Sequence, residues 1–157
     1  RTMMSKLKLT VNEQKTRLCN GRREAFTFLG YTFGPQYYRK DGHWYLGAAP
    51  ATKAVQRIKG RIRQMLCPAN HAPWEDVVTQ LNPVLRGWAA YFSYGTRLMA
   101  YRAVERYVET RVRHFLRRRH PVPTRGTRRF SSDVIFGELG VLRLRRVHLG
   151  SPVHASV

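Results

Sequence analysis

The segment TKAVQRIKGRIRQML, residues 52–66, decides the fold class because its apolar residues recur at steps of three and four. Val55, Ile58, Ile62 and Leu66 would lie on one face of an amphipathic helix. We expect Thr52 to cap this helix, because its hydroxyl can accept a hydrogen bond from a free backbone amide of the first turn. The other faces carry only basic charge: Lys53, Arg57, Lys59, Arg61 and Arg63.

Two further helices are expected towards the C-terminus. Pro73 suits the first position of a helix, and Glu75 and Asp76 suit its dipole. Pro83 lacks an amide hydrogen and clashes with the preceding turn, so we expect a kink or a restart at Asn82-Pro83. A third helix is predicted over 97–119. Its apolar stripe is separate from a narrow basic arc, and Glu109 can pair with Arg113. The basic arc consists of Arg102, Arg106, Arg113 and Arg117.

The residues before Pro50 have the composition of β-structure. Residues 26–33, FTFLGYTF, are aromatic and β-branched and predict a strand. Asp41-Gly42 lies between two aromatic-rich runs and predicts a β-hairpin with a type I′ turn. So few strands are not stable alone. The sequence therefore predicts an α+β protein in which a short N-terminal β ribbon packs on a bundle of three helices.

The charge of the chain indicates its class of partner. Its 157 residues contain 29 Lys and Arg against 9 Asp and Glu, a formal net charge of +20. This excess favours a polyanion, nucleic acid first and an acidic membrane surface second. Between Arg111 and Arg129 there are eight arginines and no acid, which indicates an exposed basic arm. The apolar runs are too short to predict a transmembrane helix.

The sequence shows no catalytic centre. Its three aspartates, Asp41, Asp76 and Asp133, fall in an expected turn, helix start and loop, and adjacent Glu75 and Asp76 diverge on a helix. Phosphate-binding glycine loops and paired-cysteine zinc motifs are absent. We therefore expect no metal site, no cofactor and no enzymatic activity of its own.

Aromatic residues allow two interpretations. Trp74, Trp88 and Tyr101 lie on apolar stripes and are interpreted mainly as core. The expected hairpin carries Tyr37, Tyr38, His43 and Trp44, which either pack or stack on unpaired bases.

Three segments together resemble a known family. They are LTVNEQKT (9–16), FTFLGYTF (26–33) and LNPVLRGWAAYF (81–92). The first two resemble the last conserved blocks of group II intron reverse transcriptases, and the third resembles their maturase-specific thumb, domain X. The similarity extends in order and spacing to about Leu144.

The resemblance implies a domain organisation. Residues 1–50 would be the end of a palm, 51–120 the helical domain X, and 121–157 a basic C-terminal extension. The family's Tyr-Ala-Asp-Asp metal motif is absent. The structural positions that carry the resemblance to the family are Gly30, Tyr31, Asn82, Pro83, Gly87, Trp88 and Tyr91. The Gly30-Tyr31 turn would lie near the family's primer-facing strand pair. Gly87 would allow close helix approach, and Trp88 would fill the core.

The leading hypothesis is a maturase fragment that binds structured group II intron RNA and assists splicing, while the RNA performs the chemistry. The predicted RNA-binding residues are Lys53, Arg57, Lys59, Arg61, Arg63, Arg86, Arg102, Arg106, Arg113, Arg117, Arg118, Arg119, Arg125, Arg128 and Arg129. One alternative is a part of a split reverse transcriptase, which would bind an RNA–DNA duplex and a separate fingers–palm fragment. Another is a degenerate remnant that binds any polyanion. A bacterial, cytoplasmic, nucleic-acid-associated protein is expected.

Overall fold

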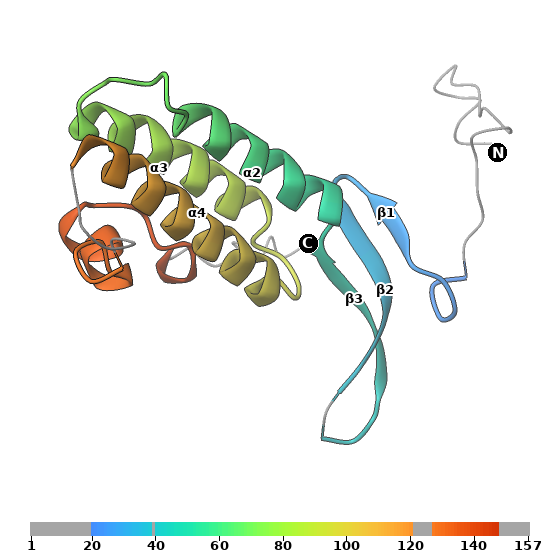
Figure 1. Ribbon diagram of the computed structural model, residues 1–157. Coiled ribbons are helices and arrows are strands. Elements are labelled where there is room, and N and C mark those ends of the chain that lie inside the picture. Colours follow the sequence, from blue (N-terminus) through green and yellow to red (C-terminus); the bar gives the residue numbers. More distant parts are fainter. Residues whose placement is uncertain (1–19, 39, 121–126, 148–157) are drawn as a thin grey trace, which may run out of the picture.

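A small antiparallel sheet is followed by a bundle of three helices in the computed structural model, which describes residues 20–38, 40–120 and 127–147 (Figure 1). The elements are β1 (Phe26–Phe28), β2 (Tyr31–Tyr37), β3 (Trp44–Pro50), α2 (Thr52–Met65), α3 (Trp74–Tyr91), α4 (Leu98–Arg119), a π-helical turn η1 (Val134–Glu138) and a 3₁₀ turn η2 (Leu144–Arg146). The predicted α+β class, with a β ribbon before three helices, is confirmed.

The sheet has the order β1-β2-β3, and both neighbouring pairs are antiparallel. The predicted single strand over 26–33 is wrong, because the chain reverses at Leu29-Gly30 and Phe28 pairs with Tyr31. Both turn residues have positive φ, 48° and 79°, as a two-residue type I′ turn requires. The Asp41-Gly42 hairpin is confirmed, but its loop is longer than two residues, since the amide of Tyr38 donates to the carbonyl of His43.

The core of the molecule lies between the three helices. Ile62 on α2, Leu81 and Leu85 on α3, and Val104 and Val112 on α4 are fully buried, as the helical periodicity predicted. The hydroxyl of Tyr101 on α4 donates to the carbonyl of Ala89 at 2.6 Å. This bond links α4 to the last turn of α3, where carbonyl groups lack partners within the helix.

The start of α2 differs from the prediction. Ala51, not Thr52, occupies the capping position, and no side chain caps the helix. Ala51 keeps the extended backbone of β3, with φ −64° and ψ 149°, and its carbonyl accepts bonds from the amides of Ala54 and Val55. Its own amide donates to the carbonyl of Gly30. The strand thus runs directly into the helix, and Thr52 is already helical. Pro73 likewise caps α3 rather than opening it.

Pro83 lies inside α3, which is one helix from Trp74 to Tyr91, so the predicted restart is wrong. Pro83 is exposed, so water can reach the backbone that its ring leaves unpaired. Leu81 and Leu85 are both fully buried on the opposite side, which holds the two halves of α3 against the core.

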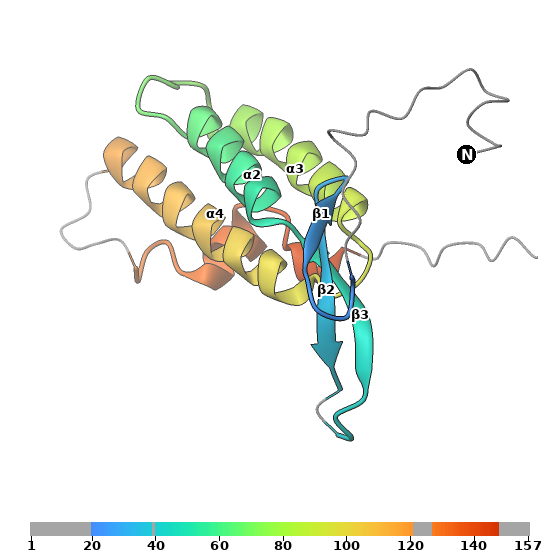
Figure 2. The same ribbon diagram turned by 90° about the vertical axis from the view of Figure 1, so that its right-hand side faces the viewer.

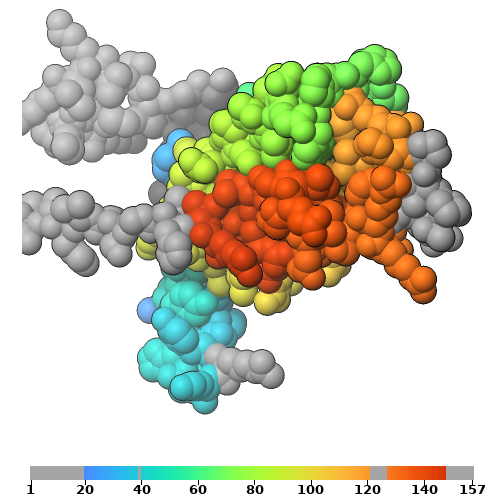
Figure 3. Space-filling model, turned by 90° about the vertical axis from the view of Figure 1, so that its left-hand side faces the viewer, coloured from blue at the N-terminus to red at the C-terminus, as the bar shows by residue number. Residues whose placement is uncertain are grey.

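The segment after α4 packs on the bundle. Phe130, Ile135, Val141 and Leu144 belong to the buried core. Figure 3 shows this segment, in orange and red, lying flat against the neighbouring helices. Residues 127–147 therefore pack with the helical unit. Within the described part of the predicted basic arm, 111–120 and 127–129, some arginines are exposed and others half-buried, and residues 121–126 lie outside the described residues.

Polar contacts fasten this C-terminal segment. The side chain of Asn82 donates to the carbonyl of Gly140 and accepts from the amide of Leu142, both at 2.8 Å. Glu105, which is buried, accepts bonds from the amide and the guanidinium of Arg145 at 3.0 and 2.7 Å. The buried carboxylate is thereby paired.

The β2–β3 hairpin projects beyond the bundle (Figures 1 and 2). At its base, the amide and hydroxyl of Thr96 both donate to the carbonyl of Ala48, at 2.7 and 3.1 Å. This contact requires Gly95, because its φ is +67° and a Cβ there would lie 2.1 Å from the Ala48 oxygen. The loop between α3 and α4 therefore fixes the angle at which the ribbon leaves the bundle.

Candidate nucleic-acid interface

Helix α2 presents the first basic surface. Lys53, Arg57, Arg61 and Arg63 are exposed on the helix, as predicted. Lys59 is half-buried, and its ammonium lies 5.5 Å from the centre of the Tyr107 ring. No acidic residue occurs between Asp41 and Glu75 along the chain. The exposed cations of α2 therefore have no carboxylate on their own helix.

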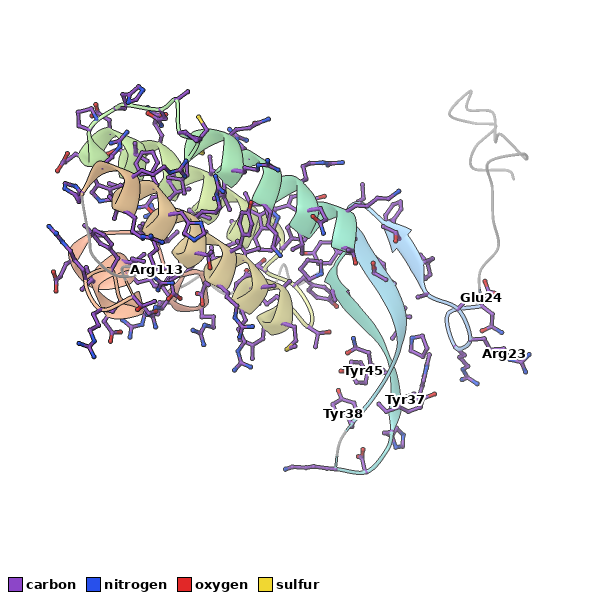
Figure 4. All side chains as sticks on the ribbon, in the orientation of Figure 1. Arg23, Glu24, Tyr37, Tyr38, Tyr45 and Arg113 are labelled. Carbon is purple, nitrogen blue, oxygen red and sulfur yellow. The ribbon has the colours of Figure 1, made fainter. Side chains whose placement is uncertain are left out.

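Helix α4 presents the second basic surface, but its predicted members separate into two groups. Arg102, Arg106 and Arg117 are exposed. Arg113 instead pairs with Glu109 at 2.5 Å, which confirms the expected ion pair, and its Nε donates to the carbonyl of Phe130 at 3.1 Å. Figure 4 shows Arg113 on the side of α4 that faces the C-terminal segment. Its charge is partly neutralised and its position is set by packing.

Arg119, at the end of α4, also holds the fold. Its guanidinium lies 4.0 Å from the centre of the Phe115 ring and donates to the carbonyls of Ala72 and Asn70. These contacts attach the α2–α3 loop to α4. The other predicted arginines of this end, Arg118, Arg128 and Arg129, are exposed, whereas Arg125 lies outside the described residues.

A hollow of about 630 Å³ lies where the end of α2 meets α4. Arg63, Arg111 and Arg118 line it, together with Gln64 and Cys67. Arg111 was missing from the predicted site residues. Its Nη2 donates to the carbonyl of Leu66 at 3.1 Å, but its Nε is buried without a partner among the described residues. The only sequence signal for Arg111 was its place in the acid-free run.

The pKa of His114 is affected by its surroundings near the C-terminal end of α4. Burial lowers the pKa of its imidazole, and nearby Arg111, Arg117 and Arg118 lower it further. Loss of solvation is the larger cause of the lowered pKa, and the positive charge of the neighbouring arginines adds to it. A phosphate group would relieve this repulsion.

A larger groove of about 770 Å³ lies between the β1–β2 turn, α2 and α3. Arg57 and Arg61 lie on its α2 side, and Pro83, Gly87 and Tyr91 lie on its α3 side. The predicted role of Gly87 is wrong, because no described atom outside its own helix lies within 4 Å of a Cβ built there. Gly87 therefore opens a surface instead of allowing two helices to approach. Trp88 packs as expected, 5.0 and 5.7 Å from the rings of Phe92 and Tyr101.

Three of the predicted motif positions meet at one end of this groove. The hydroxyl of Tyr31 donates to the carbonyl of Tyr91 at 2.7 Å, and the hydroxyl of Tyr91 donates to the carbonyl of Leu29 at 2.9 Å. Gly30 lies in the turn between β1 and β2, next to Leu29 and Tyr31. Burial raises the pKa of Tyr31, so its hydroxyl remains a neutral donor. Asn82 is elsewhere, on the contact with the C-terminal segment. Arg86 is exposed on α3.

The hairpin carries aromatic side chains outside the core. Tyr37 and Tyr38 are 65% and 56% exposed. The Tyr38 ring lies 4.5 Å from that of Tyr45, and Figure 4 shows the labelled tyrosines away from the bundle. Arg22 lies over Trp44 at 5.3 Å. These rings are available for contact with another molecule, and both interpretations of the hairpin aromatics remain open.

Carboxylates are dispersed over the described residues. Asp41 lies in the hairpin loop, Asp76 at the start of α3, and Asp133 before η1. Within residues 20–38, 40–120 and 127–147, no three His, Cys, Asp or Glu residues form a group that could hold a metal ion. The helices in these ranges are not long and apolar enough to cross a membrane.

Comparison with known proteins assigns the helical part of the chain. Residues 55–131 match the family described as group II intron, maturase-specific domain. The match includes LNPVLRGWAAYF and most of the basic surfaces on α2 and α4. No curated protein matches the chain. The resemblance noted in the sequence is thus confirmed for the part that forms the bundle.

Proposed function

We propose that this chain, whose residues 55–131 form a group II intron maturase-specific domain, binds structured intron RNA and assists its splicing. The observation that carries the proposal is the exposed, unbalanced positive charge of α2 and α4 within that domain. The RNA would supply the catalytic groups, and the protein would act without a catalytic centre of its own. We place this activity in the bacterial cytoplasm, in association with nucleic acid.

The two surfaces differ in character, which suits binding to folded RNA. Arg102, Arg106 and Arg117 occupy one line along α4 and could follow a phosphate backbone. Arg57 and Arg61 on α2 border an apolar groove instead. Phosphate contacts provide most of the affinity, whereas a shaped groove can select for RNA structure.

The first test is RNA binding over a range of salt concentrations. The logarithm of the affinity for a group II intron RNA should fall linearly with the logarithm of salt concentration, with a slope of about −0.7 to −0.9 per phosphate neutralised. Affinity that does not change with salt would contradict the proposal. A splicing assay on the same RNA, with and without protein, tests assistance directly.

A charge-matched pair of variants locates the surface. The triple variant Arg102→Gln/Arg106→Gln/Arg117→Gln should bind intron RNA more weakly and reduce the slope by about 2 to 3. The control Arg23→Gln/Lys40→Gln/Arg146→Gln removes the same charge from exposed positions outside the two helices. Equal losses in both variants would show that only net charge matters.

One observation favours a second function, as a part of a split reverse transcriptase. Large apolar side chains on the sheet are open to solvent, among them Phe28 at 59%, Leu29 at 67% and Leu46 at 46%. Exposed apolar surface on a small sheet is typical of an interface. A fingers–palm fragment would cover it, and an RNA–DNA duplex would then be the bound nucleic acid. Primer extension that occurs only after mixing with such a fragment would support this function.

Competition separates both functions from a remnant that binds any polyanion. If random RNA of equal length displaces intron RNA with equal affinity, the remnant is favoured. Selective retention of intron RNA supports a maturase role.

A further inference from the structure

The groove between the β1–β2 turn, α2 and α3 has a chemical character that phosphate binding alone does not explain. Its wall contains Val84, Trp88, Tyr91 and Phe92, and its volume of about 770 Å³ is that of a small-molecule site. Figures 1 and 2 show α2 and α3 running side by side, with the sheet at their ends. An aromatic and aliphatic hollow in a chain of net charge +20 suits an occupant with an apolar, flat part.

The charge at the edge of the same groove favours an anionic occupant. Arg57 and Arg61, one helical turn apart on α2, are exposed at its edge, and no carboxylate is among its lining residues. A free phosphate would not need the apolar wall, and an apolar peptide would not need two arginines that have no ion-pair partner among the described residues. A nucleotide has both parts, a base for the wall and a phosphate for the arginines.

Gly87 adds an independent observation. A glycine within a helix costs about 1 kcal/mol relative to alanine, and here no close contact requires it. It lies on the wall of the groove, between the turns that carry Val84 and Tyr91. The missing side chain therefore keeps the groove open along α3.

We propose that this groove receives one unpaired nucleotide of the bound RNA, with its base against the wall formed by Val84 and Tyr91 and its flanking phosphates beside Arg57 and Arg61. This inference rests on the proposed RNA-binding function and adds a structural selectivity to it. RNA that presents an extruded base is preferred over a continuous helix. The preference does not depend on the arginines of α4.

The test compares two RNA hairpins of the same stem, one with a single bulged adenosine and one fully paired. The unmodified protein should bind the bulged hairpin about tenfold more tightly, as expected for one stacked base. The variant Gly87→Phe fills the groove without changing charge, and it should lose this preference while it still binds the paired hairpin. Ala90→Phe places the same ring on an exposed position of α3 outside the groove and should keep the preference.

A second measurement does not depend on how well the variant folds. In a hairpin whose bulged adenosine is replaced by 4-thiouridine, ultraviolet light should join the RNA to the unmodified protein within residues 83–92. Cross-links found only at other segments would overturn the proposal, as would a preference for the bulge that survives in Gly87→Phe. Equal binding of both hairpins overturns the groove proposal alone, whereas binding of neither also overturns the proposed function. If Gly87→Phe prevents association with a fingers–palm fragment and leaves the bulge preference intact, the occupant is a protein segment and the proposal is wrong.

Discussion

At the scale of single residues, two glycines occupy opposite environments. One position has no room for a side chain, and the other has open space beside it. Gly95 has a positive φ and no room for a Cβ, because the Ala48 carbonyl is in the way. Gly87 is helical and faces open space. The sequence alone does not distinguish them, since each is flanked by aromatic and polar residues.

Alanine at each glycine should therefore change stability in opposite directions. Gly87→Ala should raise the free energy of unfolding by up to about 1 kcal/mol through helix propensity. Gly95→Ala should lower it by at least about 1–3 kcal/mol through backbone strain, with the clash at Ala48 in addition. Urea unfolding followed by circular dichroism measures both. Similar effects of the two substitutions would contradict these contacts.

The tryptophans offer a second comparison at this scale. Trp74 Nε1 donates to the carbonyl of Leu139 at 3.0 Å, whereas Trp88 Nε1 is buried without a partner among the described residues. Trp74→Phe should destabilise the protein by about 1–3 kcal/mol more than Trp88→Phe, because only the first leaves a carbonyl unpaired. Both substitutions remove the same atoms, and only Trp74→Phe removes a hydrogen bond. Thermal unfolding of both variants decides the order, and a larger loss in Trp88→Phe would refute it.

At the scale of elements, the C-terminal segment packs against the helical bundle. Residues 139–147 are joined to α3 and α4 by side chains of Asn82, Trp74 and Glu105. The segment thus contributes residues to the core of the helical bundle. The resemblance implied a basic extension from residue 121, and four residues of this extension belong to the buried core: Phe130, Ile135, Val141 and Leu144.

Asn82 is the residue to substitute for this contact. Asn82→Ala removes both hydrogen bonds to residues 140 and 142, and it should speed amide exchange in 139–147 while α2 stays protected. Gln80→Ala, at an exposed position of the same helix, is the control and should leave exchange unchanged. Uniform loss of protection across the bundle would show that the segment and the helices unfold together.

At the scale of the whole molecule, the net charge of +20 acts on stability and on binding in opposite directions. Like charges on α2, α4 and the C-terminal segment repel one another when the chain is compact. Screening by salt reduces this repulsion, and it equally weakens attraction to RNA phosphates.

We therefore expect the melting temperature of the free protein to rise between about 0.05 and 0.5 M sodium chloride, over which the Debye length falls from about 14 to 4 Å. Over the same range, the affinity for RNA should fall. Differential scanning fluorimetry gives the first quantity and filter binding the second. A melting temperature that falls with salt would show that attractive ion pairs, such as Glu105–Arg145, outweigh the repulsion.

Much of the fold and part of the site could be predicted from the sequence. The helices of residues 52–66 and 97–119 were predictable because apolar periodicity reports directly which face is buried. The resemblance implied a turn at Gly30-Tyr31, but its place at Leu29-Gly30 was not predictable, since a leucine with positive φ is uncommon. Among the basic residues, Arg119 could not be separated from Arg102 and Arg106, because its partners are backbone carbonyls distant in sequence. For Arg113 the pair with Glu109 was predictable, but the bond to the carbonyl of Phe130 was not.

The sequence by itself determined the net charge, the three helices and the family resemblance of the helical domain, because charge, periodicity and motif are local properties of the chain. Only the tertiary structure decided which arginines remain available to a ligand and that Gly87 opens a groove. It also decided that the C-terminal segment belongs to the core. These outcomes depend on contacts between residues 17 to 65 positions apart, such as Arg113 with Phe130 and Trp74 with Leu139. Such contacts form only when packing brings separate elements together, and the order of residues along one element does not encode them.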